Sequence, residues 1–140
     1  LGLAIAHSPH ADLQSLGREI QARLFDLGSY LASPDAERRA KAGIAPPQIV
    51  DVHALEGSID RLEHELTPLK RFVLPGGTPA AAAFHLARTV CRRAERGCVA
   101  LDAEQPLDAT ALGYLNRLSD LLFVLARVAN KRAGAGEVTW

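Results

Sequence analysis

The chain has 140 residues, of which 48% are hydrophobic but only 5% aromatic, and its 16 basic side chains balance 16 acidic ones. This length suits one domain with a real core, and an apolar fraction supplied mainly by Ala and Leu favours helices over sheets. The balanced charge excludes a global field that would attract nucleic acid or anionic lipid, and no apolar run reaches the ~20 residues of a membrane span, so we expect neither nucleic acid nor a membrane as a partner.

The chain opens with Leu1-Gly2-Leu3-Ala4-Ile5-Ala6, a helical pattern without a start signal. Because the sequence also contains no Met, we expect that these residues end a helix that begins in a native N-terminal segment upstream.

Apolar residues three and four positions apart predict a first long helix over residues 13–31, with Ser8 as its N-cap and Pro9 in its first position. Residues 33–47 are polar, rich in alanine and interrupted by proline, which predicts a surface connection with room for a short helical turn. A second helix follows from Leu55 and is expected to end near Pro68.

Thr78 and Pro79 predict the start of another helix, because Thr can cap it and Pro fits its first turn. It is expected to run to about Ala103. The last helix covers residues 112–129, with Asp108 as N-cap and Gly134 after its end. Residues 133–138 contain glycines and are expected to be loose.

No stretch of strict apolar–polar alternation predicts a strand. We therefore predict an all-α, up-and-down bundle of four long helices plus the end of an N-terminal helix, a five-helix bundle that is ferritin-like in outline. Residues 1–140 form a single domain in this prediction.

Cys91 and Cys98 lie seven residues apart on one predicted helix face, about two turns from each other, which is too far for a disulfide. No Cys or His spacing indicates a structural zinc. Two reduced, small core residues suit a reducing compartment, so we predict a cytoplasmic location.

The segment Arg88-Thr89-Val90-Cys91-Arg92-Arg93-Ala94-Glu95-Arg96 concentrates four arginines on one predicted helix. Arg88, Arg92 and Glu95 share a face of it. One interpretation is a solvated face with local Arg–Glu pairs. The other is a polyphosphate site, because guanidinium groups match phosphate oxygens and stay charged, with Glu95 orienting an arginine or binding a ribose hydroxyl or a magnesium-bound water.

In Tyr114-Leu115-Asn116-Arg117-Leu118-Ser119-Asp120, Asn116 and Ser119 lie close to the leucine stripe. Either they form an interhelical hydrogen-bond network, or Asn116 reads a nucleoside with its donor and acceptor. Arg117 and Asp120 are expected to form a local ion pair. Upstream, Phe72-Val73-Leu74-Pro75-Gly76-Gly77-Thr78 predicts a tight turn and lacks the lysine of a phosphate-binding P-loop.

The order RFVLPGGTPAAAAFHLARTVCRRAER, then YLNRLSDLLFVLAR, resembles the trimeric, PduO-type ATP:cob(I)alamin adenosyltransferases. The earlier IQARLFDLGSYLASP and LEGSIDRLEHELTPL resemble the same family, so the likeness covers nearly the whole chain. It implies a helical bundle in a homotrimer with active sites between subunits, and transfer of the 5′-deoxyadenosyl group of ATP to reduced cobalamin with Mg²⁺ present. A hand-off of the product to an adenosylcobalamin-dependent enzyme is a further implied partner.

The resemblance also assigns residues. It implies that ATP is contacted by the positions Arg88, Arg92, Arg93, Ala94, Glu95, Arg96 and Asn116, with Arg88 and Arg92 serving catalysis and Phe72 packing against the corrin below the cobalt. It implies no resident metal site. The family's glycine- and threonine-containing phosphate loop, its lysine and its Asp-Glu-Leu-Asn run belong upstream of Leu1, so this chain is expected to hold half of the ATP site.

Three alternative functions compete with this one. A ferritin-like metal bundle needs Glu-x-x-His on two helices, but Val50, Arg61 and Ala82 stand at the glutamate positions before His53, His64 and His85. All five histidines, His7 and His10 included, are expected to be surface or satisfied interhelical residues. A non-catalytic trimer that carries nucleotide or cobalamin predicts binding without turnover, and a plain helical interaction module predicts neither.

Overall fold

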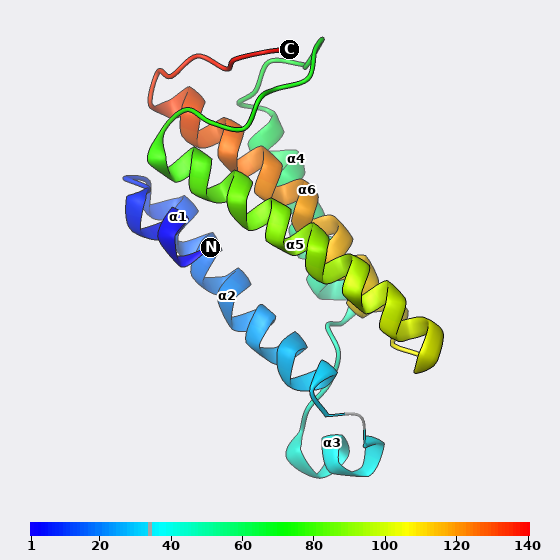
Figure 1. Cartoon of the computed structure of the whole chain (residues 1–140). Coiled ribbons are helices and arrows are strands. Elements are labelled where there is room, and N and C mark those ends of the chain that lie inside the picture. The colour runs from blue at the N-terminus through cyan, green and yellow to red at the C-terminus, as the bar shows by residue number, and fades with distance from the viewer. Residues whose placement is uncertain (34) are drawn as a thin grey trace.

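The computed structural model describes residues 1–33 and 35–140, and within these residues the regular secondary structure is helical apart from one isolated β-bridge (Figure 1). The helices are α1 (Gly2–His7), α2 (Ala11–Leu31), α3 (Ala36–Ala42), α4 (Ile49–Glu63), α5 (Pro79–Glu104) and α6 (Ala109–Arg132). The predicted all-α bundle is confirmed. Among the described helices, none is long and apolar enough to cross a bilayer.

Helix α6 is the centre of the bundle and packs against both α5 and α4, while α1 packs against α5 and α2. Figure 1 shows α5 and α6 side by side and antiparallel, with the short α3 set apart at one end. The predicted surface connection therefore contains a short helix; Pro34 in it lies outside the described residues. The largest fully buried side chains are Leu13, Ile20, Phe84, Tyr114, Leu118, Leu121, Leu125 and Val128.

Capping side chains begin α5 and α6 as the sequence predicts. Thr78 Oγ1 accepts a hydrogen bond from the backbone N–H of Ala81, and Asp108 accepts one from Thr110. The predicted start of α2 is wrong by two residues, because Ser8 is extended, buried and ends α1 instead. Its carbonyl oxygen accepts a 2.7 Å hydrogen bond from the Gln14 side chain, which holds the sharp connection between the two helices.

The predicted end of α4 near Pro68 is also wrong, since the helix stops at Glu63. Contacts with α6 explain the early stop: Glu65 accepts a 2.6 Å hydrogen bond from Arg132, and its carbonyl oxygen accepts one from Lys131. The Arg132 guanidinium lowers the pKa of the Glu65 carboxyl. Tertiary hydrogen bonds thus replace the turn of helix that the leucine spacing favours.

The tail after α6 is paired rather than loose, which corrects the prediction for residues 133–138. Leu74 N–H donates to the carbonyl oxygen of Val138 at 2.8 Å, and Trp140 N–H donates to that of Phe72 at 2.9 Å. Val73 and Thr139 form the antiparallel bridge between these hydrogen bonds. The spacing of apolar residues predicts helices, and it gives no indication that residues 72–74 and 138–140 pair through their backbones.

Asn130 of α6 fixes the turn that leads into α5. Its Oδ1 accepts from the Thr78 N–H at 2.9 Å and its Nδ2 donates to the Gly76 carbonyl oxygen at 3.0 Å. Between them, Gly77 has a φ of +96° and its Cα lies so close to the amide that an added Cβ would stand 2.1 Å from Oδ1. Only glycine meets both demands.

Gly77→Ala is therefore expected to lower the free energy of unfolding by at least about 2 kcal/mol, from backbone strain and a clash with Asn130. Gly76→Ala is the matched control, because no atom of the described residues lies within 4 Å of its added Cβ and its φ is not positive. Urea unfolding of both variants measures the difference. Equal stability of the two would contradict the assigned packing.

Candidate functional site

Three of the predicted site residues meet where α5 packs on α6. Arg92 Nη1 lies 2.5 Å from Glu95 Oε2, one turn along α5. The other carboxylate oxygen of Glu95 accepts a 3.0 Å hydrogen bond from Asn116 Nδ2 of α6. The interhelical hydrogen bond that the sequence left as an alternative for Asn116 is present, and it binds Asn116 to the arginine helix.

Exposure differs within this cluster in a way that matters for binding. The Glu95 side chain is 13% exposed, whereas that of Arg92 is 43% exposed. Glu95 is thus fixed between a cation and an amide, while Arg92 keeps most of its five N–H donors for a ligand. A half-exposed guanidinium held by a partly buried carboxylate suits an anion with several oxygens, such as a phosphate chain.

Arg88 lies one turn before Arg92 on α5 and extends over the ring of Phe123 from α6, 5.2 Å from the ring centroid. No hydrogen bond or ion pair engages its guanidinium within the described part of the chain. A cation held by an aromatic face keeps its donors available. Arg88 therefore extends the cationic face of Arg92 toward Phe123.

The other predicted residues lie outside this cluster. Arg93 and Arg96 are exposed, without hydrogen-bond or ion-pair partners among the described residues. The Ala94 side chain lines an apolar groove of about 290 Å³ together with Val90 and Leu115. Two residues along a helix turn a side chain by about 200°, so Ala94 lies on the side of α5 opposite Arg92.

Phe72 stands apart from the arginines, in the segment between α4 and α5. Its side chain is 77% exposed, although its carbonyl oxygen is held by Trp140. Among the described residues, no hydrogen bond, ion pair or ring contact joins it to the arginine cluster. A large apolar ring in water is available to a partner or ligand.

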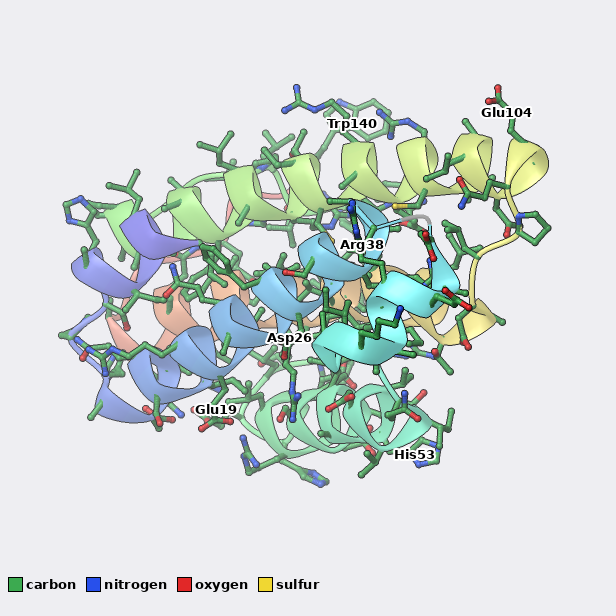
Figure 2. The ribbon with its side chains drawn as sticks, turned by 90° about the horizontal axis from the view of Figure 1, so that it is seen from below. Glu19, Asp26, Arg38, His53, Glu104 and Trp140 are labelled. Atoms are coloured by element: carbon green, nitrogen blue, oxygen red, sulfur yellow. The ribbon has the colours of Figure 1, made fainter. Side chains whose placement is uncertain are left out.

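The histidines only partly follow the expectation. His7, His53 and His64 are exposed, and Figure 2 shows His53 on the outer side of α4. The prediction is wrong for His85, which is 5% exposed and whose two ring nitrogens have no hydrogen-bond partner among the described residues. Burial and the charge of Arg88 lower its pKa, which keeps the ring neutral. In the described part of the chain, the buried Nε2 of His10 also has no hydrogen-bond partner.

The cysteines are confirmed as small, free core residues. Burial and the charge of Glu95 raise the pKa of Cys91 to about 11, and burial raises that of Cys98. Both thiols are therefore poor nucleophiles. Across residues 1–33 and 35–140, no three His, Cys, Asp or Glu side chains are grouped as metal ligands.

Sequence reasoning missed three residues near the site. Phe123 supports Arg88, and the same ring lies under Arg127 at 5.9 Å. Arg127 is 7% exposed at its side chain and pairs with Glu137 of the tail. A single arginine within the apolar LLFVLARVAN run was the available signal, because a buried charge requires a partner.

The model of the cobalamin adenosyltransferase family matches residues 1–129. The Cupriavidus metallidurans cobalamin adenosyltransferase is 43% identical over 92% of this chain and 66% of its own length. The Bacillus subtilis corrinoid adenosyltransferase is 42% identical over 100% of this chain and 72% of its own length. Among solved structures, a variant of the Lactobacillus reuteri PduO-type ATP:corrinoid adenosyltransferase complexed with cobalamin and ATP superimposes with a TM-score of 0.86, at 38% identity, covering 93% of this chain and 71% of that one.

Proposed function

The chain belongs to the cobalamin adenosyltransferase family, and we propose that it transfers the 5′-deoxyadenosyl group of ATP to cob(I)alamin, giving adenosylcobalamin and triphosphate. The Lactobacillus reuteri relative is complexed with both cobalamin and ATP, which supports this choice of substrates. Within the chain, the single observation that carries the proposal is the half-exposed Arg92 held by Glu95 and Asn116.

The chemistry asks little of side chains as acids or bases. Cobalt(I) is itself a strong nucleophile, and its electron pair forms the bond to C5′ of the ribose. The C5′–O bond breaks, and its electron pair leaves with the triphosphate. The protein has to hold C5′ in line with the cobalt and stabilise the charge that gathers on the leaving group.

The residue roles follow from this demand. Arg92 and Arg88 bind the phosphate chain and stabilise the departing triphosphate, and Glu95 orients Arg92. Asn116, fixed by Glu95, contacts the nucleoside. Arg93 and Arg96 add positive charge at the rim, and Ala94 contributes packing only, because its side chain lines the groove on the opposite side of α5.

Phe72 is assigned to the corrin. An exposed apolar ring below the cobalt would exclude water and the cofactor's own base from that face. The four-coordinate cobalt that results is easier to reduce to cobalt(I). Its 77% exposure leaves the ring open to such a contact.

Mg²⁺ enters this proposal as part of the substrate, MgATP. The described residues offer no carboxylate cluster for it, and both oxygens of Glu95 are engaged by Arg92 and Asn116. This ion usually binds to substrate phosphates and water with few protein ligands, so the residues that the structure describes do not fit a resident magnesium site.

We further propose a homotrimer with active sites between subunits. Arg92 and Arg88 lie on an outer face of a single bundle, so a bound phosphate chain needs a second wall to exclude water. A neighbouring subunit can supply it. Sedimentation velocity of the full-length protein tests the oligomeric state. A cytoplasmic location and a hand-off of product remain predictions.

Anaerobic turnover of the full-length protein with reduced cobalamin and MgATP tests the function. The visible spectrum reports formation of adenosylcobalamin, and a phosphate-chain assay reports triphosphate. Both products in equal amounts are expected. Binding of either substrate without turnover would favour a carrier, and no binding of either would refute the proposed function.

A further inference from the structure

The segment that carries Phe72 has no helix of its own to hold it, and the tail supplies its backbone partners. Leu74 N–H donates to Val138, and Trp140 N–H donates to the carbonyl oxygen of Phe72, at 2.8 and 2.9 Å. Figure 1 shows the tail crossing beside this loop at one end of the bundle. The backbone of Phe72 is thus positioned by residues 138–140.

The tail is itself anchored to α6 by one buried ion pair. Arg127 Nε lies 2.7 Å from Glu137 Oε1, and its Nη2 lies 3.2 Å from Oε2, so the contact is bidentate. Nη2 also donates to the carbonyl oxygen of Thr67, at the start of the same loop, at 2.8 Å. The Arg127 side chain is 7% exposed and that of Glu137 is 25% exposed.

This arrangement makes Arg127 the junction of the loop and the tail. Breaking a buried ion pair on one side leaves an unpaired charge, which is far more costly than losing a surface pair. The Phe123 ring lies under both Arg127 and Arg88. The Phe123 ring therefore connects the Arg127–Glu137 ion pair to the cationic face assigned to the phosphates.

We propose that Glu137 is a positioning residue for corrinoid binding: its ion pair with Arg127 holds the tail against the Phe72 segment and so presents the aromatic ring to the corrin. This role rests on the proposed function, since it presumes that Phe72 contacts the corrinoid. Glu137 and Arg127 touch neither substrate in this arrangement. Their effect on the reaction passes through the backbone of residues 72–74.

Glu137→Gln tests the role, because it removes the charge with little change of shape. Hydrogen exchange at the Leu74 and Trp140 amides is expected to become at least about tenfold faster. The fluorescence anisotropy of Trp140, the single tryptophan of the chain, should fall. The KM for corrinoid is expected to rise about tenfold, the order of one lost aromatic contact, while the KM for ATP stays unchanged.

Glu104→Gln is the matched control. Glu104 ends α5 and is exposed (Figure 2), at the opposite end of the bundle from the tail in Figure 1. The same loss of one charge there should leave all four readouts at the wild-type values.

A disulfide between the tail and the Phe72 segment tests whether Glu137 acts by holding the tail in place or by its charge alone. Val73 and Thr139 face each other in the antiparallel bridge as a non-hydrogen-bonded pair, where Cα atoms lie about 4.5 Å apart, within the range of a disulfide. Val73→Cys with Thr139→Cys, oxidised in the Glu137→Gln background, should restore slow exchange and the low KM for corrinoid. Reduction should abolish the rescue.

The outcomes separate this role from the proposed function. If Glu137→Gln leaves exchange and the KM for corrinoid unchanged, or loosens the tail without affecting the KM that Phe72→Ala raises, the positioning role is refuted while the function stands. If Phe72→Ala leaves corrinoid binding unchanged and the wild type does not turn over, the function itself fails. A disulfide that restores exchange but not KM also refutes positioning.

Discussion

Arg92→Ala is expected to lower the rate of adenosyl transfer by about 100-fold to 1,000-fold, the usual effect of removing one group that stabilises a charged transition state. The bundle should remain folded, because the Arg92 side chain is 43% exposed and pairs with Glu95 at the helix surface. The expected loss of stability is less than about 1 kcal/mol. Single-turnover kinetics and thermal unfolding measure the two effects separately.

Two further variants sharpen this prediction. Arg92→Lys keeps the charge but loses the planar fork, so we expect activity between that of the wild type and that of Arg92→Ala. Arg38→Ala removes an exposed arginine of α3, the short helix that Figure 1 shows set apart at one end of the bundle, and should leave turnover unchanged. Normal turnover of Arg92→Ala would show that the phosphate site lies elsewhere.

Phe72→Ala is expected to impair corrinoid handling and to spare ATP. Losing one aromatic contact is worth about 1.5–3 kcal/mol, or about 10-fold to 100-fold in affinity. Reduction of bound cobalt(II) should fall at least as much, because water and the cofactor's own base regain the lower face of the cobalt. Corrinoid titration, reduction rates and ATP titration are compared on the same preparations.

Phe25→Ala is the control for this variant. Phe25 is also strongly exposed, at 81%, but lies on α2 rather than beside the tail. Its replacement should leave both substrates unaffected. Equal loss of ATP and corrinoid binding in Phe72→Ala would indicate general unfolding and would contradict a specific contact.

Local sequence patterns were sufficient to predict the existence of the long helices and which arginines share a face of α5. Threonine and aspartate caps set the starts of α5 and α6, and threes-and-fours spacing set their faces. The same spacing placed Arg92 beside Glu95, because residues three apart on a helix are neighbours whatever the rest of the chain does. Sequence patterns were therefore sufficient for contacts between residues that are close in the chain.

Tertiary structure alone decided whatever depends on residues far apart in the chain. Asn116 reaches Glu95 only because α6 packs antiparallel on α5. The end of α4 moved from Pro68 to Glu63 because hydrogen bonds from α6 hold Glu65. Each of these contacts forms only when two helices pack together. The spacing of apolar residues within one segment gives no information about that packing.

The tail after α6 is the clearest example of a contact that only the folded structure specifies. Its glycines correctly indicate that it forms no helix, but they say nothing of Arg127, 10 residues away from Glu137 in sequence. A buried arginine must find a counter-charge, and the folded bundle places Glu137 within its reach. The sequence therefore determined which groups are available, and the tertiary structure decided which of them meet, because pairing a buried charge is a condition imposed only once the core has formed.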